Sequence, residues 1–209
     1  AAAFPRLAAA AMDKNGVIQC LELAKNGTID RVYPLQGNEH VVGLNLLTAE
    51  KRRFEASLAR STGKYTIAGP FPLVQGGVGA LLFDPIFKYN SKGEYGFWGF
   101  AVVVIDWKAF VKEVNLQRLE KSGYHYSIWH RDPYSGAKAS IAKSDHLVSA
   151  DAIQVSCPMP NDFWYVDIEV DGGWISPLTQ DAYWALAMLI SLLLTIGYWQ
   201  FATGRIKEQ

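Results

Sequence analysis

Histidine and cysteine are the residue types in this chain best suited to metal binding or nucleophilic catalysis, but their spacing supports neither. The four histidines share no metal-ligand spacing: His40, His125, His130 and His146. Neither Cys20 nor Cys157 belongs to a CxxC pair. His125 alternates with aromatic neighbours in a short β-rich run, which favours a core or edge position over a metal ligand. The sequence therefore predicts no metal site.

One glycine-rich segment, Gln75-Gly-Gly-Val-Gly79, is superficially similar to a phosphate-binding loop. Such a loop ends in Lys followed by Ser or Thr, and it leads into a helix whose N-terminus faces the anion. Here no such pair follows, and the next run is predicted to be a strand. Asp84-Pro85 supplies a lone carboxylate in a turn-forming pair, and no GxSxG motif occurs. We expect no catalytic residues, no cofactor and no enzymatic activity in this chain.

The composition is apolar and electrically balanced. Twenty Lys and Arg residues match twenty Asp and Glu residues, and half of the 209 residues are hydrophobic. A neutral chain without a basic run has no electrostatic footprint for nucleic acid, so we expect no nucleic-acid partner. Cys20 and Cys157 fall in different predicted subdomains, which leaves a disulfide open but favours two buried thiols.

A membrane-spanning helix is predicted near the C-terminal end. No charged residue occurs from Ala182 to Ala202, and a helix of that length spans roughly 30 Å, the thickness of bilayer hydrocarbon. Tyr183-Trp184 and Tyr198-Trp199 flank the apolar core as interfacial aromatic residues do. The alternative is a buried C-terminal helix of a soluble protein. The uninterrupted apolar run and the two aromatic pairs favour the membrane.

The charges on either side of this helix predict its orientation. Arg205 and Lys207 follow it, whereas acidic residues precede it: Asp167, Glu169, Asp171 and Asp181. Basic residues concentrate on the cytoplasmic side of membrane helices. We therefore expect residues 1–181 to be extracytoplasmic, the C-terminus to be cytoplasmic, and the protein to lie in the cell inner membrane.

Both ends of the chain resemble cut ends of a longer protein. Residues 1–12 lack an initiator methionine and the charge pattern of a signal peptide. They indicate the last turns of a helix, so we expect residues 1–16 to end an N-terminal signalling helix. The sequence stops at Ile206–Gln209, where a cytoplasmic helix would continue. We expect a fragment trimmed at both ends.

The first part of the chain predicts a hairpin and then a helix. Runs Val17–Leu23 and Thr28–Tyr33 flank Lys25-Asn-Gly27, and Asn-Gly between two such runs is a strong hairpin signal. A helix is expected from Ala49 to Ser61, with Thr48 as its N-cap. The residues expected to signal its end and its apolar face are Gly63, Leu47, Phe54 and Leu58.

The stretch from Ile67 to Phe100 organises this part of the chain. Two apolar runs, Gly79–Phe83 and Phe97–Ile105, are separated by a polar, glycine-containing segment and predict neighbouring antiparallel strands. Just before them, Gly69-Pro70 and Gln75-Gly-Gly77 form a glycine-rich loop. Such a loop beside a sheet is either a tight corner or the rim of a ligand pocket, and the residues alone leave both open.

A second, smaller unit follows. Asp106 is expected to cap a helix that carries apolar residues to Val114, and Leu116–Lys121 predicts a short helix ended by Gly123. Three strands are expected next: Tyr124–Trp129, Ile153–Cys157 and Phe163–Ile168. Residues 131–151 are polar and rich in turn residues, so they are expected to form a connection. The predicted fold class is therefore α+β.

An ordered set of short motifs over residues 12–174 resembles the CHASE domain, an extracellular sensory domain associated with cyclases and histidine kinases. Its main elements are Tyr33-Pro34, Asn38, Gly43, Thr62-Gly63, Gly69-Pro70, Leu73, Gln75-Gly-Gly77, Pro85-Ile-Phe87, Trp98-Gly-Phe100 and Ile105-Asp106. Gly123–Tyr126 and the ending from Trp164 to Trp174 are also similar to bacterial members. Single elements are weak signals, but their order is specific.

The resemblance implies an architecture. It implies an N-terminal helix, two PAS-like antiparallel-sheet subdomains and a transmembrane helix. The membrane-distal, ligand-sensing subdomain would be residues 17–114, the membrane-proximal one residues 115–176, and the membrane helix residues 182–202. It also implies a full-length protein with a cytoplasmic diguanylate cyclase, phosphodiesterase or histidine kinase module.

The resemblance further implies where a small ligand binds. Plant members, which are cytokinin receptors, have an aspartate in the stretch that matches Gly43–Leu47, and this chain has Asn45 there. An amide carries no charge, which argues against a purine ligand of the plant kind. Gln75 and Gly76 would flank the pocket, and its apolar wall would be formed by Leu81, Phe83 and Phe100.

Two functions remain open at this stage. The first is a signalling sensor that works as a homodimer and relays binding of an unknown small molecule across the membrane. The second is a membrane-tethered interaction or scaffold module without a small ligand. A ligand pocket in the distal sheet would favour the first, whereas a filled core and a large exposed apolar patch would favour the second.

Overall fold

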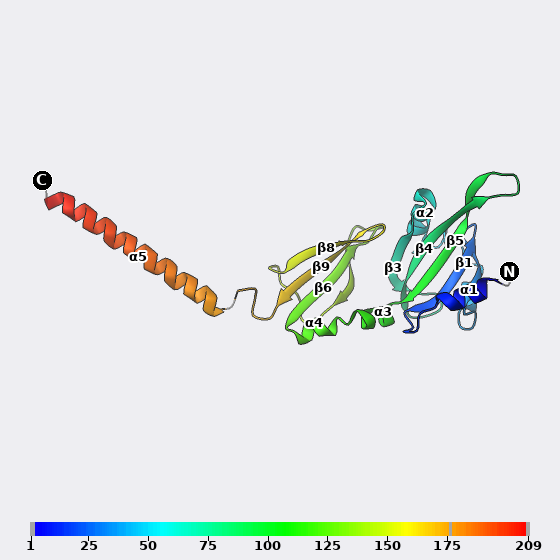
Figure 1. The fold of residues 1–209 in the computed structure, drawn as a ribbon, viewed down its shortest axis with the longest axis horizontal. Coiled ribbons are helices and arrows are strands. Elements are labelled where there is room, and N and C mark those ends of the chain that lie inside the picture. The colour runs from blue at the N-terminus through cyan, green and yellow to red at the C-terminus, as the bar shows by residue number, and fades with distance from the viewer. Residues whose placement is uncertain (1–2, 176, 208–209) are drawn as a thin grey trace. The chain divides into compact units, whose positions relative to one another are not determined.

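The computed structural model describes residues 3–175 and 177–207 (Figure 1). Residues 1–2 of the expected N-terminal helix, residue 176 at the end of the expected second subdomain, and residues 208–209 lie outside the described residues. The chain divides into two units, Ala1–Ile168, which holds both β-sheets, and Glu169–Gln209, which holds the C-terminal helix. Helix α1 spans Ala3–Ala11.

The first sheet begins with the predicted hairpin. Strands β1 (Ile18–Lys25) and β2 (Thr28–Tyr33) pair antiparallel around Asn26 and Gly27, whose φ angles are 51° and 86°. These positive φ angles explain the Asn-Gly sequence, because both residue types tolerate the left-handed region. The 3-10 helix η1 (Glu39–Val41) follows.

Strands β3 (Thr66–Pro72), β4 (Val78–Tyr89) and β5 (Tyr95–Asp106) complete a five-stranded sheet in the order β2-β1-β5-β4-β3. The expected β4–β5 pair is confirmed. Gly69-Pro70, expected in a loop, instead lies within edge strand β3, where the register shifts between Ala68 and Phe71. An edge strand with a bulge is one of the few places in a sheet that tolerate proline.

Helix α2 differs from its expected limits and face. It spans Arg53–Thr62 rather than starting at Ala49, and Thr48 does not cap it, since its hydroxyl donates to the Asn45 carbonyl. Its buried residues are Glu55, Ala56 and Ala59, whereas Phe54 is exposed. Small alanines let the helix lie close to β3 and β4, which larger side chains would prevent. The expected glycine at its end is confirmed, because Gly63 has φ 70°.

The core of this part lies on the inner face of the first sheet. Strand β1 contributes Cys20, Glu22 and Ala24 to it, and neighbouring β5 contributes Phe100, Val102 and Val104. Leu81 and Phe83 of β4 pair with Val104 and Val102. Among these buried side chains Glu22 is the one with a carboxyl group, so it marks an unusual position in an apolar layer.

Two helices lead to the second sheet. Helix α3 (Trp107–Val114) is capped as expected, with the Asp106 carboxylate accepting from Ala109 N at 2.7 Å, and α4 (Gln117–Lys121) follows. The sheet has the order β7-β6-β9-β8. Its strands are β6 (Tyr124–Arg131), β7 (Lys138–Lys143), β8 (Ile153–Pro158) and β9 (Phe163–Val170).

Strand β7 corrects the expectation of a connection over residues 131–151. It is a polar edge strand, and Ile141 is its one buried side chain. Because an edge strand needs few apolar residues, the pattern gave no strand signal. Together the helix, the two antiparallel PAS-like sheets and the C-terminal helix confirm the predicted α+β fold class.

The C-terminal helix α5 spans Pro177–Lys207 (Figure 1). Its segment Leu178–Phe201 is long and apolar enough to cross a membrane, by length and composition, with a mean hydropathy of 1.6. An apolar helix of this length matches the thickness of bilayer hydrocarbon. Both cysteines are free thiols, and the expectation that both are buried is confirmed for Cys20 but wrong for Cys157, which is exposed.

Candidate functional site

A small cavity lies on the inner face of the first sheet, and we call it the first-sheet cavity. Its volume is about 10 Å³, room for about one water molecule. It is lined by three polar side chains, Glu22, Arg52 and Gln75, and by six apolar ones: Ile29, Val41, Leu44, Leu46, Leu73 and Leu81. An apolar lining with a few convergent polar groups is the composition typical of small-molecule sites.

Glu22 is the most unusual of these side chains. It is 3% exposed, because the pleat of β1 turns it inward beside Val102 of β5. Burial raises the pKa of its carboxyl group to about 7, and the opposing charge of Arg52 limits that rise. Its Oε2 atom has no hydrogen-bond partner among the described residues. A buried acceptor without a donor is costly, so it favours a proton or a ligand that donates one.

Cys20 and Gln75 extend this polar group. The Cys20 thiol donates to Glu22 Oε1 at 3.8 Å and accepts from Gln75 Nε2 at 3.8 Å. Burial raises the pKa of the Cys20 thiol, with a further contribution from Glu22, so the thiol stays protonated. It therefore acts as a weak hydrogen-bond relay rather than as a nucleophile.

Arg52 closes the cavity from the helix side. It occupies the N-cap position of α2 and is 8% exposed. Its guanidinium lies 5.0 Å from the ring centre of Phe71, a cation–π contact with β3. Burial lowers the pKa of Arg52, and the charge of Glu22 opposes that change. The cavity thus offers an acceptor from β1 and five N–H donors from the start of α2.

The residues predicted from the sequence lie in four different places, and Asn45 is described separately below. Gln75 and Leu81 line the first-sheet cavity. Phe83 and Phe100 are fully buried and pack edge to face, with ring centres 5.8 Å apart. Gly76 lies in the turn after β3, with φ 97°.

Asn45 supports the backbone instead of lining this cavity. Its Nδ2 donates to Thr28 Oγ1 at 3.3 Å, and its Oδ1 accepts from Leu47 N at 2.9 Å. These contacts hold the segment after η1 against the start of β2, where Thr28 and Asn45 also form a backbone bridge. The structure therefore brings Gln75 and Leu81 together and leaves Asn45, Gly76, Phe83 and Phe100 outside the lining.

Sequence reasoning missed Glu22 and Arg52. The signal for Glu22 is a charged residue in the middle of a predicted strand, two residues from Cys20 and from Ala24. This signal does not identify Glu22 as buried, because Leu21 and Leu23 are apolar on the opposite face and the strand has no single apolar face. The burial of Arg52 could not be predicted, because Arg53 is adjacent to it and the sequence does not indicate which of the two side chains is buried.

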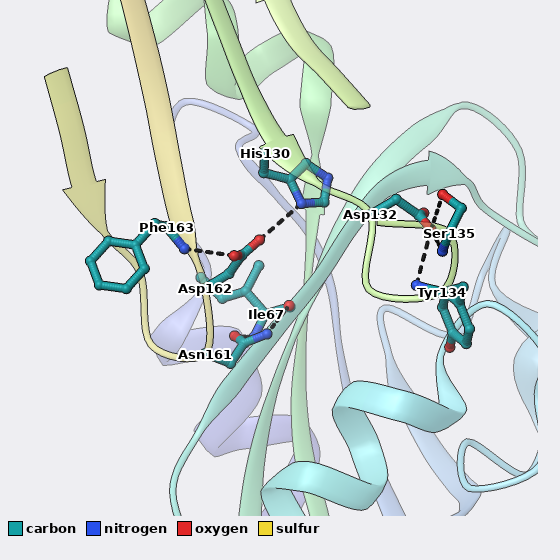
Figure 2. A network of polar contacts seen from close by, with 8 residues as sticks. All are labelled: Ile67, His130, Asp132, Tyr134, Ser135, Asn161, Asp162 and Phe163. Carbon is teal, nitrogen blue, oxygen red and sulfur yellow. Dashed lines mark hydrogen bonds and ion pairs between the residues drawn. The ribbon is translucent and has the colours of Figure 1, made fainter. Parts of the chain in front are cut away.

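The first sheet is bonded directly to the second. Asn161, in the turn between β8 and β9, accepts from Ile67 N at 2.7 Å and donates to Ile67 O at 3.1 Å (Figure 2). Phe54 N, in the first turn of α2, donates to the Tyr134 hydroxyl at 3.3 Å, and the two rings lie edge to face. These contacts involve α2 and β3, whose neighbours in the chain line the first-sheet cavity: Arg52 precedes α2 and Leu73 follows β3.

The comparisons with known proteins agree with this architecture. The sequence profile of the CHASE domain matches residues 21–138. An extracellular ligand binding receptor from Desulfohalobium retbaense DSM5692 has a similar structure, with a TM-score of 0.58 and 15% sequence identity. The alignment covers 78% of this chain and 32% of the receptor, and at this identity it shows a shared fold. No curated protein matches the chain.

Proposed function

Because the chain belongs to the CHASE domain family, a family of sensory and non-catalytic domains, we propose that it senses a small molecule in the first-sheet cavity. The observation that carries this proposal is the buried Glu22 carboxyl group, whose Oε2 lacks a donor among the described residues. A domain that only had to be stable would gain from an apolar residue at this position.

The lining residues favour a polar, neutral or zwitterionic ligand. Glu22 needs a hydrogen-bond donor, whereas Arg52 and Gln75 offer donors to a carboxylate or carbonyl oxygen. The apolar residues around them would contact the rest of the ligand. The roles of Asn45, Gly76, Phe83 and Phe100 in ligand binding stay predictions, and their contacts support a structural role.

Binding would move the start of α2. The cavity has room for about one water molecule, so a larger ligand must displace lining side chains. Arg52 is the N-cap of α2. Two residues later, Phe54 N donates to the Tyr134 hydroxyl of the second sheet's β6–β7 turn. A shift of Arg52 toward a ligand would therefore pull on the second sheet, and Asn161 would follow through Ile67.

The membrane context completes the proposal. Helix α5 would span the inner membrane with residues 1–181 outside the cytoplasm, as the charge bias of its flanks indicates. Residues 17–114 would form the membrane-distal subdomain and residues 115–176 the membrane-proximal one. The receptor would work as a homodimer and control a diguanylate cyclase, phosphodiesterase or histidine kinase module in the cytoplasm.

A thermal-shift screen of the full chain in lipid nanodiscs tests this function. Small polar metabolites are screened for a rise in Tm, and the hit is repeated on Gln75→Leu and Asn45→Leu. We expect Gln75→Leu to fold and to weaken binding about tenfold or more, since it leaves a buried partner unpaired. Asn45→Leu should lower Tm without ligand. Absence of any hit would favour an interaction module without a small ligand.

A further inference from the structure

A second and larger cavity lies between the two sheets, and we call it the inter-sheet cavity. It has a volume of about 500 Å³ and adjoins a space of about 240 Å³, with which it shares Glu55, Gly69, His130, Asp132 and Pro133. Volumes of this size are typical of small-molecule sites. None of the three polar residues of the first-sheet cavity lines it. Figure 2 shows His130, Asp132 and Asp162, which the second sheet contributes to this region.

Among the described residues that line these two spaces, Glu55 is the one with a buried side-chain oxygen that lacks a hydrogen-bond partner. It is 6% exposed and lines both spaces, on the buried face of α2. Its Oε2 atom has no hydrogen-bond partner within the described ranges 3–175 and 177–207. Its backbone carbonyl accepts from the Thr66 hydroxyl at 2.8 Å, which fixes this turn of the helix against β3. An unpaired carboxylate held rigidly at a cavity requires a donor.

Of the other three carboxylates that line the two spaces, Glu50 is exposed to solvent, whereas Asp132 and Asp162 already have partners. Asp132 accepts from Tyr134 N at 3.0 Å and from Ser135 N at 2.7 Å, so it holds the turn between β6 and β7. Asp162 lies 3.0 Å from His130 Nδ1 and accepts from Phe163 N at 2.7 Å. These bonds, drawn in Figure 2, leave Glu55 as the group that a ligand would satisfy.

The local charge favours a cation. Burial raises the pKa of Glu55 to about 7, and the negative charges of Asp132 and Asp162 add to that rise. Lys51 and Arg53 line the larger space and Arg131 lines the smaller one, but all three are exposed and none forms an ion pair with Glu55 in the described part of the chain. Four acidic side chains therefore line the two spaces, Glu50, Glu55, Asp132 and Asp162, and Glu55 is the buried one, without a counter-ion among the described residues.

We propose that the inter-sheet cavity binds a small molecule through a primary ammonium group, with Glu55 as its main acceptor. A primary ammonium carries three N–H donors, one of which satisfies Glu55 Oε2, whereas a quaternary ammonium has none. Phe71 and Tyr134 supply apolar and aromatic surface for the remainder of the ligand. The amine would join α2 to the turn after β6, next to the contact of Phe54 with Tyr134. It would thus act on the connection between the sheets.

Titration calorimetry with 1,4-diaminobutane tests this site, on the full chain in lipid nanodiscs. We expect the amine to bind the parent chain and to bind Glu55→Gln about tenfold or more weakly, because a charged hydrogen bond is lost. Glutamine keeps the volume of glutamate and removes an unpaired buried charge, so this variant should fold at least as well as the parent. Two control variants should bind the amine like the parent: Glu22→Gln in the first-sheet cavity and Glu39→Gln on the exposed surface.

Two control ligands separate charge from shape. 1,4-Butanediol, which is neutral and of similar length, and tetramethylammonium, which has no N–H donor, should both bind far more weakly than the diamine. The proposal is overturned if the diamine does not bind the parent chain, if Glu55→Gln binds it equally well, or if the diol matches it. Loss of binding in Glu22→Gln alone would assign the amine to the first-sheet cavity and would also overturn it.

Discussion

The side chain of Asn161 bonds both backbone groups of Ile67, with its Oδ1 2.7 Å from Ile67 N and its Nδ2 3.1 Å from Ile67 O. An amide side chain here replaces a strand neighbour for edge strand β3, although the two residues are 94 positions apart in the chain. A residue from the β8–β9 turn of the second sheet therefore satisfies backbone groups at the edge of the first sheet. This bond fixes the sheet edge that carries Gly69 and Phe71, which line the inter-sheet cavity.

Asn161→Ala should separate ligand binding from signal output. Both bonds are lost and a part-buried backbone N–H loses its partner, so we expect a loss of about 1–3 kcal/mol in the free energy of unfolding. Affinity at the first-sheet cavity should stay within about twofold, since no lining residue changes, whereas the output of the full-length receptor should fall. Asn90→Ala, in the exposed β4–β5 turn, is the control. An unchanged response in Asn161→Ala would rule out this route.

Stability should fall as pH rises through the range set by Glu22 and Glu55. Both carboxyl groups have pKa values near 7 in the folded chain, against an ordinary value of 4.5. The folded state therefore binds more protons than the unfolded state between these values, and their stabilising effect is full below pH 4.5 and lost above 7.

Denaturant titrations at several pH values measure this effect. The parent chain should lose on the order of 1–3 kcal/mol of unfolding free energy across that window, and the double variant Glu22→Gln/Glu55→Gln should lose much less. Glu39→Gln is the control, because backbone hydrogen bonds lower the pKa of Glu39. The Glu39 carboxylate stabilises the folded chain more as pH rises, so its removal should change the pH dependence of stability in the opposite direction. A parent chain whose stability rises with pH over this window would contradict the assignment.

Gly69→Ala should destabilise the chain more than Gly76→Ala does. Their φ angles are 104° and 97°, so both substitutions introduce similar backbone strain, of about 1 kcal/mol. At Gly69 the new Cβ would lie 2.8 Å from the Gly79 carbonyl oxygen, whereas at Gly76 it would meet open space. Comparing the two variants separates the cost of backbone strain, which both share, from the cost of the steric clash with β4, which only Gly69→Ala introduces. Equal losses of unfolding free energy would show that the approach is not tight.

Helix α5 should place the C-terminus in the cytoplasm. Its apolar segment Leu178–Phe201 is preceded by acidic residues and followed by Arg205 and Lys207. Reporter fusions after Gln209 should be active only with a cytoplasmic reporter. Activity of a periplasmic reporter at the same junction would reverse the orientation.

Local signals along the sequence predicted most of the fold. Asn26-Gly27, Asp106 and Gly63 each act within a few residues, so turn and cap chemistry identified the hairpin and the helix ends. Strand β7 escaped because a polar edge strand has no apolar face, and α2 was misplaced because small alanines, rather than Phe54, face the sheet. These features depend on neighbours that are distant in the chain.

The lining of the first-sheet cavity was only partly predictable, because it also depends on neighbours that are distant in the chain. Gln75 and Leu81 follow from the motifs around them, but Glu22 and Arg52 become a pair only when β1 and the start of α2 meet. Asn45 and Phe83 are equally plausible ligand contacts in the sequence. Their hydrogen bonds and ring packing, visible only in the fold, show that they already have partners.

Ligand binding in the first-sheet cavity should satisfy the buried Glu22 carboxyl group. Titration calorimetry of the small polar ligand found by screening measures this directly, on the parent chain, Glu22→Gln and Glu39→Gln. We expect Glu22→Gln to remain folded and to bind about ten- to a hundredfold more weakly, because one charged hydrogen bond is lost, while Glu39→Gln binds like the parent. Equal affinity of Glu22→Gln and the parent chain would contradict the claim and assign the ligand to another site.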